Sequence, residues 1–144
     1  MPLTPFHLAI CVHDLTMARQ FYGGVLGCAE GRSAAGWVDF NLLGHQLVCH
    51  LHPELDANSR DRHKNPVDGE DVPVPHFGVV LTMRDWQALA MRIADAGVDF
   101  VIKPSIRFAG QPGEQATMFF LDPSGNALEF KAFADPERLF ANGS

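Results

Sequence analysis

The sequence predicts an α+β fold built from two similar halves. Two observations carry this prediction. A short apolar run that opens with histidine occurs twice, over residues 7–12 and 76–81. Each run is followed by apolar residues at helical spacing and then by further strand-like runs. Each half is therefore expected to contain a strand, a helix and at least two more strands.

In the first half, the helix is indicated by apolar residues at positions 15, 18, 21, 22, 25 and 26, and Gly27 marks its end. Gly44-His45 separates two apolar runs in the manner of a hairpin turn. The expected elements are a strand over 6–12, a helix over 15–26, an additional strand over 29–33, and strands over 37–43 and 46–51.

The second half repeats this outline. Trp86, Leu89 and Ile93 have helical spacing after Asp85, and Gly97 closes that segment. The expected elements are a strand over 75–81, a helix over 85–94, an additional strand over 98–103, and strands over 116–121 and 126–133 around the turn Asp122-Pro123-Ser124-Gly125.

We expect one domain over residues 1–144, with module one at about 4–52 and module two at about 75–133. The connecting segment, about 53–74, has turn-forming residues such as Asp68-Gly69 and no periodicity, so it is interpreted as a long loop. Loops of that length are usually functional, and this one and a second loop over 107–117 could border a cavity. The tail, 134–144, is expected to form a short helix after Asp135-Pro136.

The composition argues against several classes of function. The chain has 144 residues, a net charge of -6 and scattered basic residues, which excludes a basic face for nucleic acid. No apolar stretch approaches the roughly 18–20 residues needed to cross a bilayer. The first residues lack the basic and then apolar pattern of a secretion signal, so a cytoplasmic protein with no membrane partner is expected.

His7, His76 and Glu129 are the strongest functional candidates. Each lies on a strand-like run, and strand alternation places small residues on the same face as each histidine. Taken singly, each is more simply a hydrogen-bonded polar residue, and repetition of the histidine at the start of both halves is what favours function. Two imidazoles and one carboxylate can hold a divalent metal ion.

His50 is a fourth candidate. It lies on the strand that occupies, in the first half, the place of the Glu129 strand in the second. Its imidazole could serve as a further metal ligand or as an acid-base group near neutral pH.

The chain resembles the vicinal oxygen chelate superfamily, which includes glyoxalase I, methylmalonyl-CoA epimerase, extradiol dioxygenases and bleomycin or fosfomycin resistance proteins. The resemblance covers nearly the whole chain and implies two βαβββ modules whose curled mixed sheets surround a central cavity. It rests on His7, Asp14, Phe21-Tyr22, Leu26-Gly27, His76, the segment Asp122-Pro123-Ser124-Gly125-Asn126, and Glu129.

The details look most like small bacterial proteins described as predicted extradiol dioxygenases. The two segments that carry this likeness are Pro75-His76-Phe77-Gly78-Val79 and Gln111-Pro112-Gly113-Glu114-Gln115-Ala116-Thr117.

For such an enzyme the resemblance implies metal ligands at His7, His76 and Glu129, with Fe(II) favoured and positions left open for substrate and oxygen. Extradiol enzymes usually carry a substrate-contacting tyrosine where this chain has Phe119, a departure that counts against catechols as substrates.

Two alternatives remain open. A glyoxalase I-like lyase, or an epimerase or isomerase, would use Zn, Ni or Mn with a fourth ligand near His50. A metal-free binding protein of the drug-sequestering kind would hold a ligand without acting on it, although such proteins usually lose the ligand triplet. The expected partners are a small-molecule substrate and a second copy of the chain, because superfamily members of this length commonly form homodimers.

Overall fold

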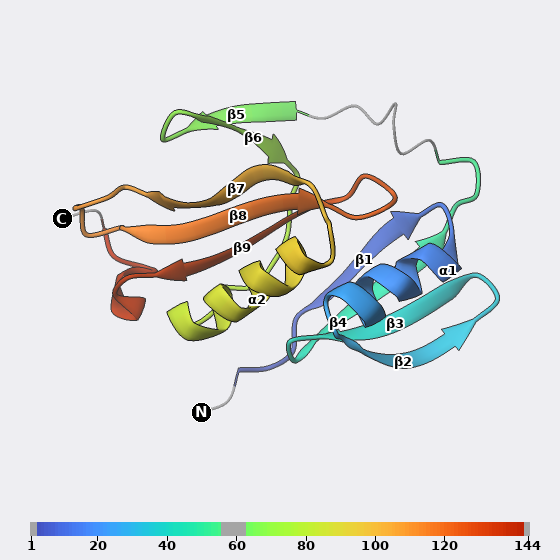
Figure 1. The fold of residues 1–144 in the computed structure, drawn as a ribbon. Helices are drawn as coiled ribbons and strands as arrows, with labels where there is room; N and C mark the ends of the chain where they lie inside the picture. The colour runs from blue at the N-terminus through green and yellow to red at the C-terminus, as the bar shows by residue number, and fades with distance from the viewer. Residues whose placement is uncertain (1–2, 56–62, 143–144) are drawn as a thin grey trace. The chain divides into compact units, whose positions relative to one another are not determined.

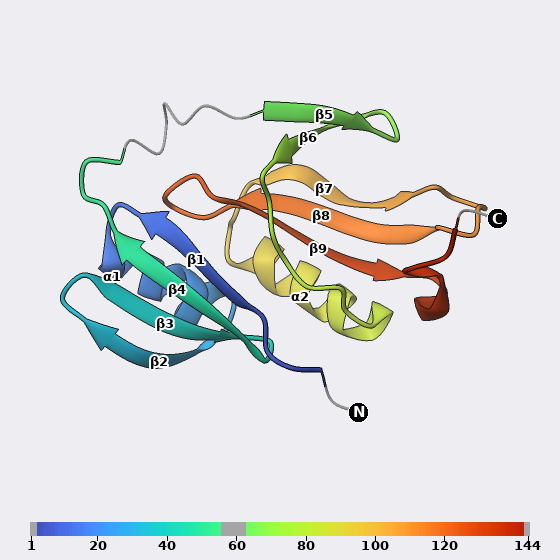
Figure 2. The same ribbon diagram turned by 180° about the vertical axis from the view of Figure 1, so that it is seen from behind.

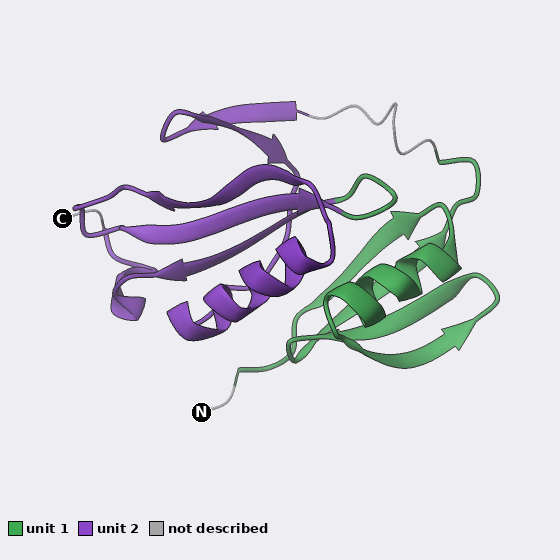
Figure 3. Cartoon of the chain, in the orientation of Figure 1, with its two compact units in different colours: residues 1–60, 122–126 green, residues 61–121, 127–144 purple. Residues whose placement is uncertain are grey.

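The computed structural model describes residues 3–55 and 63–142, which divide between two compact units (Figure 3). Unit 1 comprises Met1–Arg60 with Asp122–Asn126, and unit 2 comprises Asp61–Leu121 with Ala127–Ser144. Each unit contains a β-sheet with a helix against it (Figures 1 and 2). Mixed sheets with few helices confirm the predicted α+β class.

Unit 1 is a four-stranded sheet of order β1-β4-β3-β2, in which β1 runs parallel to β4 and the other neighbours are antiparallel. The expected helix is present as an α-helical turn that continues as a π-helix. Asp14 begins it by accepting a 2.9 Å hydrogen bond from the backbone N–H of Met17. The elements are β1 His7–Val12, α1 Leu15–Ala18, η1 Arg19–Val25, β2 Ala29–Ala34, β3 Trp37–Leu42 and β4 His45–Leu51.

Unit 2 contains a three-stranded antiparallel sheet of order β7-β8-β9 and a two-stranded hairpin, β5-β6. Thr82 caps the N-terminus of helix α2, and its hydroxyl accepts from the Asp85 backbone N–H at 3.2 Å. The Trp86 indole N–H donates to the Phe130 carbonyl at 2.9 Å and fixes α2 on β9. The elements are β5 His63–Val67, β6 Glu70–Val74, α2 Met83–Asp95, β7 Phe100–Arg107, β8 Gln115–Leu121, β9 Ala127–Phe133 and the short helix η2 Pro136–Arg138.

The strand expected over 75–81 is not a continuous strand. It contacts β9 through two isolated parallel bridges, Phe77 to Leu128 and Val80 to Lys131. Gly78 lies between them, and a Cβ atom there would be 1.5 Å from the carbonyl oxygen of Glu129. Only glycine permits so close an approach of two backbones, so this residue sets how tightly the segment lies against β9.

The prediction of a structureless loop over about 53–74 is wrong for its second half, which forms the β5-β6 hairpin; residues 56–62 lie outside the described part. Asp68 and Gly69 make the turn, with φ of 46° and 82°. This pair is a strong hairpin signal, because both central residues of such a turn need positive φ. Val72 of the hairpin packs against Ile102 and Phe119, so the hairpin covers one face of the sheet of unit 2.

The segment between β8 and β9 belongs to unit 1 and is held there by a buried polar network. The fully buried Tyr22 hydroxyl donates to the Asp122 carboxylate at 2.7 Å, and burial together with that negative charge raises the pKa of Tyr22 well above its usual value. Ser124 and Asn126 add hydrogen bonds to His13 and to the Cys11 carbonyl. The resemblance motifs of both halves therefore meet in this network.

The remaining connections are short. The expected loop over 107–117 spans only the residues between Arg107 and Gln115, because β8 already begins at Gln115. The short helix expected after Asp135-Pro136 is confirmed as η2. Among the described residues, no helix has the length and apolar character needed to cross a membrane.

We expect Gly78→Ala to lower the free energy of unfolding by about 1–3 kcal/mol or more, because the added methyl group must displace the β9 backbone. Chemical denaturation of both proteins measures this. Gly113→Ala is the matched control, since a Cβ there meets nothing within 4 Å. Equal stability losses for the two variants would contradict the close-packing argument.

Candidate metal-binding site

Unit 2 contains a cavity of about 180 Å³ on the sheet face that the β5-β6 hairpin covers. That volume is below the roughly 300–1,000 Å³ of pockets that hold drug-sized ligands, so the cavity suits a small molecule. The two segments expected to border a cavity, residues 53–74 and 107–117, both contribute lining residues, which confirms that expectation. The lining residues are Val67, Val72, His76, Arg107, Phe108, Gln115, Phe119, Glu129 and Lys131.

His76 and Glu129 meet in this cavity. Phe77 pairs with Leu128, so His76 precedes that pair by one residue, Glu129 follows it by one, and their side chains share a face. The His76 Nε2 atom lies 3.1 Å from Glu129 Oε1. Thr117, on β8, donates a hydrogen bond to the other carboxylate oxygen and fixes the orientation of the group.

The tautomer of His76 follows from its second contact. Its Nδ1 atom lies 2.6 Å from the Pro73 carbonyl oxygen, which can only accept, so Nδ1 carries a proton. Nε2 is consequently the atom offered to the cavity. A ring N–H held by a backbone carbonyl is the usual support of a histidine metal ligand.

The charges of the pair stabilise each other. The hydrogen bond to Glu129 raises the pKa of His76, although partial burial opposes this. Burial alone would raise the pKa of Glu129, but the hydrogen bonds from His76 and Thr117 and the Lys131 charge outweigh it and leave that pKa lowered. Lys131 Nζ lies 3.9 Å from Glu129 Oε1. The carboxylate is therefore ionised, as a metal ligand must be.

These donors fit a divalent metal ion. Metal–nitrogen and metal–oxygen bonds of about 2.0–2.2 Å place neighbouring ligand atoms roughly 3 Å apart, close to the observed separation of Nε2 and Oε1. An imidazole and a carboxylate suit iron, manganese, nickel or zinc. The pair could supply two ligands, and a third side chain would be needed to complete a triad.

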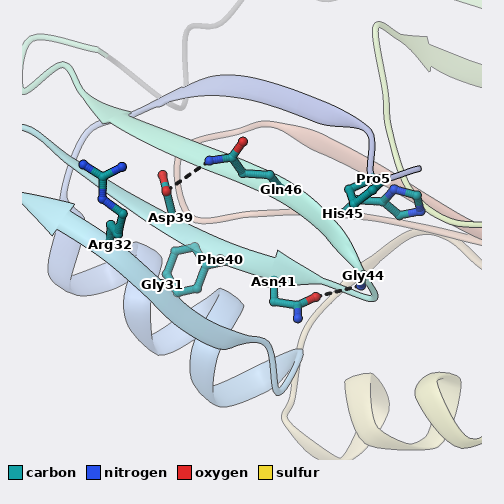
Figure 4. A pocket seen from close by; sticks show the side chains of 9 residues that line it. All are labelled: Pro5, Gly31, Arg32, Asp39, Phe40, Asn41, Gly44, His45 and Gln46. Carbon is teal, nitrogen blue, oxygen red and sulfur yellow. Dashed lines mark hydrogen bonds between the residues drawn. The ribbon is translucent and has the colours of Figure 1, made fainter. Parts of the chain in front are cut away.

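His7 belongs to unit 1, where it is exposed at the start of β1. Its Nδ1 lies 2.8 Å from Gln46 Oε1. The Gln46 amide in turn donates to Asp39 at 3.1 Å, as Figure 4 shows. The Asp39 carboxylate only accepts, so the Gln46 amide nitrogen must face it and Gln46 Oε1 must accept from His7. His7 therefore carries its proton on Nδ1 and presents Nε2, the same tautomer as His76. A second pocket of about 340 Å³ lies beside Gln46 in unit 1.

The strand register shows that His50 is not the counterpart of Glu129. In unit 1, Leu8 pairs with Leu47, as Phe77 pairs with Leu128 in unit 2. The residue after Leu47 is Val48, which is buried and has no ligand atom. His50 lies two residues farther along β4, is exposed, and corresponds to Lys131. His50 was assigned to the right strand from the sequence, but it lies two residues beyond the position that corresponds to Glu129.

The structure thus brings together two of the four predicted site residues, His76 and Glu129. His7 and His50 belong to unit 1, and their places in the site remain predictions. Within residues 3–55 and 63–142, no group of three histidine, cysteine or acidic side chains is assembled. The sequence analysis missed Thr117 and Arg107, which reach the site through strand pairing that no local pattern reveals.

The model of the Glyoxalase/Bleomycin resistance protein/Dioxygenase superfamily matches residues 4–130. A glyoxalase/bleomycin resistance protein/dioxygenase from Alicyclobacillus acidocaldarius is 34% identical, with 94% of this chain and 96% of that chain covered and a TM-score of 0.78. No protein with a curated description matches.

Two more distant structures share the fold. The fosfomycin resistance protein FosX from Listeria monocytogenes has 20% identity, coverage of 96% and 100%, and a TM-score of 0.68. Lactoylglutathione lyase from Agrobacterium tumefaciens has 19% identity, coverage of 97% and 98%, and a TM-score of 0.64. The family match over residues 4–130 and the 34% identical protein from Alicyclobacillus acidocaldarius show that the chain belongs to the glyoxalase/bleomycin resistance protein/dioxygenase superfamily.

Proposed function

We propose that this protein is a metal-dependent enzyme of the extradiol dioxygenase type, with Fe(II) held by His7, His76 and Glu129. The observation that carries the proposal is that His7 and His76 are held in the same way, through their Nδ1 atoms. Each has Nδ1 engaged by an acceptor, Gln46 in one unit and Pro73 in the other, so Nε2 is the nitrogen that would bind a metal. In His76, Nε2 would bind the metal in place of the proton through which it contacts Glu129 Oε1. The same arrangement recurs at equivalent positions of the two units, and a purely structural role of either histidine would not require this.

The ligand set favours dioxygenase chemistry over a glyoxalase I-like lyase or an isomerase. Val48 occupies the position where the first unit would supply a fourth ligand, so three ligands remain. Two histidines and one carboxylate leave positions on ferrous iron for a chelating substrate and for dioxygen. The lyase alternative, with Zn, Ni or Mn, would need His50 to bind the metal from two residues farther along β4.

Other residues of the chain would orient the ligands, shape the cavity and transfer protons. Thr117 and Lys131 hold the Glu129 carboxylate ionised and oriented. Phe119 is fully buried with its ring edge-on to His76, at a centroid distance of 4.8 Å, and gives the cavity an apolar floor. His50 is the proposed acid-base group, and a homodimer acting on a small molecule is the proposed assembly.

A metal-free binding protein is the second candidate. Retention of His7, His76 and Glu129 argues against it, because binding proteins of the drug-sequestering kind usually lose this triplet. The decisive measurement is the metal content of the purified protein together with oxygen uptake on a panel of catechols and related substrates.

His7→Ala, His76→Ala and Glu129→Ala should each weaken iron binding by about a hundredfold or more, since removal of a ligand exceeds the effect of removing its support. Anaerobic titration with Fe(II), followed by elemental analysis, measures the affinity. His63→Ala is the control, because this exposed histidine lies at the start of β5. Unchanged affinity in His7→Ala alone would remove His7 from the ligand set.

Gln46→Ala should weaken iron binding about 10- to 100-fold without unfolding the protein. The substitution removes the hydrogen bond that orients the His7 ring, but the ligand atom Nε2 is still present. The same titration applies. Gln87→Ala, on the exposed side of α2, is the matched control. An affinity equal to that of the control would show that the Gln46 contact does not prepare a ligand.

His50→Ala should keep the full iron content and lower turnover about 10²- to 10⁴-fold, the usual contribution of an acid-base group. Iron content and oxygen uptake are measured on the same sample. Loss of iron in this variant would instead assign His50 to the metal and favour the lyase or isomerase alternative. Full turnover would exclude both roles.

A further inference from the structure

Arg107 is the one charged side chain of the cavity that the proposed metal site does not use. It ends β7, is only 5% exposed and lines the cavity with His76 and Glu129. Its Nη1 donates to the Val67 carbonyl at 3.1 Å, which ties the guanidinium to the β5-β6 hairpin. The guanidinium carbon lies 5.7 Å from the centroid of the Phe119 ring, so an aromatic face supports the cation.

The remaining edge of this guanidinium is unpaired. Nε and Nη2 are both buried and have no hydrogen-bond partner among the described residues. A buried donor without a partner costs about 1–3 kcal/mol, and more when it is charged, so such atoms call for an explanation. The contacts at Val67 and Phe119 explain how the side chain is held, but they leave this edge without an acceptor.

The chemistry of the edge identifies an acceptor. Nε–H and one Nη2–H point in parallel from the same side of the planar group, and they match the two oxygens of a carboxylate. The charges agree: Glu129 is the one carboxylate lining the cavity, and it is already engaged by His76, Thr117 and Lys131. Arg107 is therefore the cation left to meet an incoming anion.

We propose that Arg107 is a specificity-determining residue that binds the carboxylate of a small organic acid through Nε and Nη2. This rests on the proposed function for its setting, in which the same substrate offers vicinal oxygens to the metal. The substrate class is then a small carboxylic acid with two adjacent oxygen substituents, and the cavity of about 180 Å³ limits its size.

The pairing can be tested without metal, with benzoate as the probe and benzamide as its neutral isostere. In the metal-free full-length protein, benzoate should bind about 10- to 100-fold more tightly than benzamide, the range expected for charge-assisted hydrogen bonds. It should also shift the Nε–H resonance of Arg107 in a ¹H–¹⁵N spectrum. No preference, or no shift at Arg107, would overturn the proposal, even if Arg107 variants fail to fold.

Variants and a second anion complete the experiment. Arg107→Gln should abolish the preference for benzoate, and Arg107→Lys should lose most of it because an ammonium group lacks the paired donors. Arg84→Gln, at an exposed arginine on α2, should leave it unchanged. Tighter binding of inorganic phosphate than of benzoate would overturn the assignment to a carboxylate.

The outcome is separable from that of the proposed function. Benzoate binding at Arg107 in a protein that takes up no iron would support the carboxylate site and reject the metal enzyme. Iron binding by His7, His76 and Glu129 without any preference for benzoate would support the metal enzyme and reject the carboxylate site.

Discussion

The close parallel contact between residues 76–81 and β9 is the constraint on which the candidate site depends. Phe77 donates to the Ala127 carbonyl at 3.2 Å and accepts from the Glu129 N–H at 2.8 Å. These bonds place His76 and Glu129 on one face, one residue to either side of the Phe77–Leu128 pair. Gly78 allows the contact, because any side chain there would strike the Glu129 carbonyl oxygen. Backbone geometry therefore brings the two side chains together before their charges contribute.

The electrostatics of the cavity follow from burying that carboxylate. An ionised glutamate that is 8% exposed must be offset by cations or hydrogen bonds. His76, Thr117 and Lys131 supply them and use the accepting capacity of Glu129. Arg107 consequently has no carboxylate of its own, although it lines the same cavity. Metal binding and anion recognition would thus arise from one arrangement of charges.

Most of the fold could be predicted from the sequence, because local patterns specify it. Helical spacing between Asp14 and Gly27 and the repeated histidine runs predicted the elements of both halves. The β5-β6 hairpin was missed because Pro66 and Pro73 interrupt its strands and its residues do not alternate. Asp68-Gly69 was the signal that could have found it.

The site could be predicted only in part, because register is not a local property. Repetition of a histidine singled out His7 and His76, and Glu129 was selected only in combination with them, as a carboxylate on the last strand-like run. The hydrogen bond from Thr117 depends on β8 pairing with β9 so that Phe119 faces Glu129. The two-residue offset between Val48 and His50 depends on the pairing of β1 with β4. Neither relation follows from spacing along the chain.

The Nδ1 atoms of His7 and His76 have different hydrogen-bond acceptors in the two units, and the strand register explains why. Gln46 faces His7 across β1 and β4, and its amide can bridge to Asp39. The equivalent position in unit 2 is Ala127, one residue before the partner of Phe77, and its methyl group cannot accept a hydrogen bond.

Unit 2 uses the carbonyl of Pro73 instead, and Pro73 belongs to the hairpin that covers the cavity. One hairpin therefore orients the His76 ring, holds Arg107 through Val67 and covers one face of the sheet. Under the proposed function, a change in the hairpin would affect both the proposed ligand His76 and the proposed carboxylate-binding residue Arg107, whereas a change at Gln46 would affect the proposed ligand His7 alone.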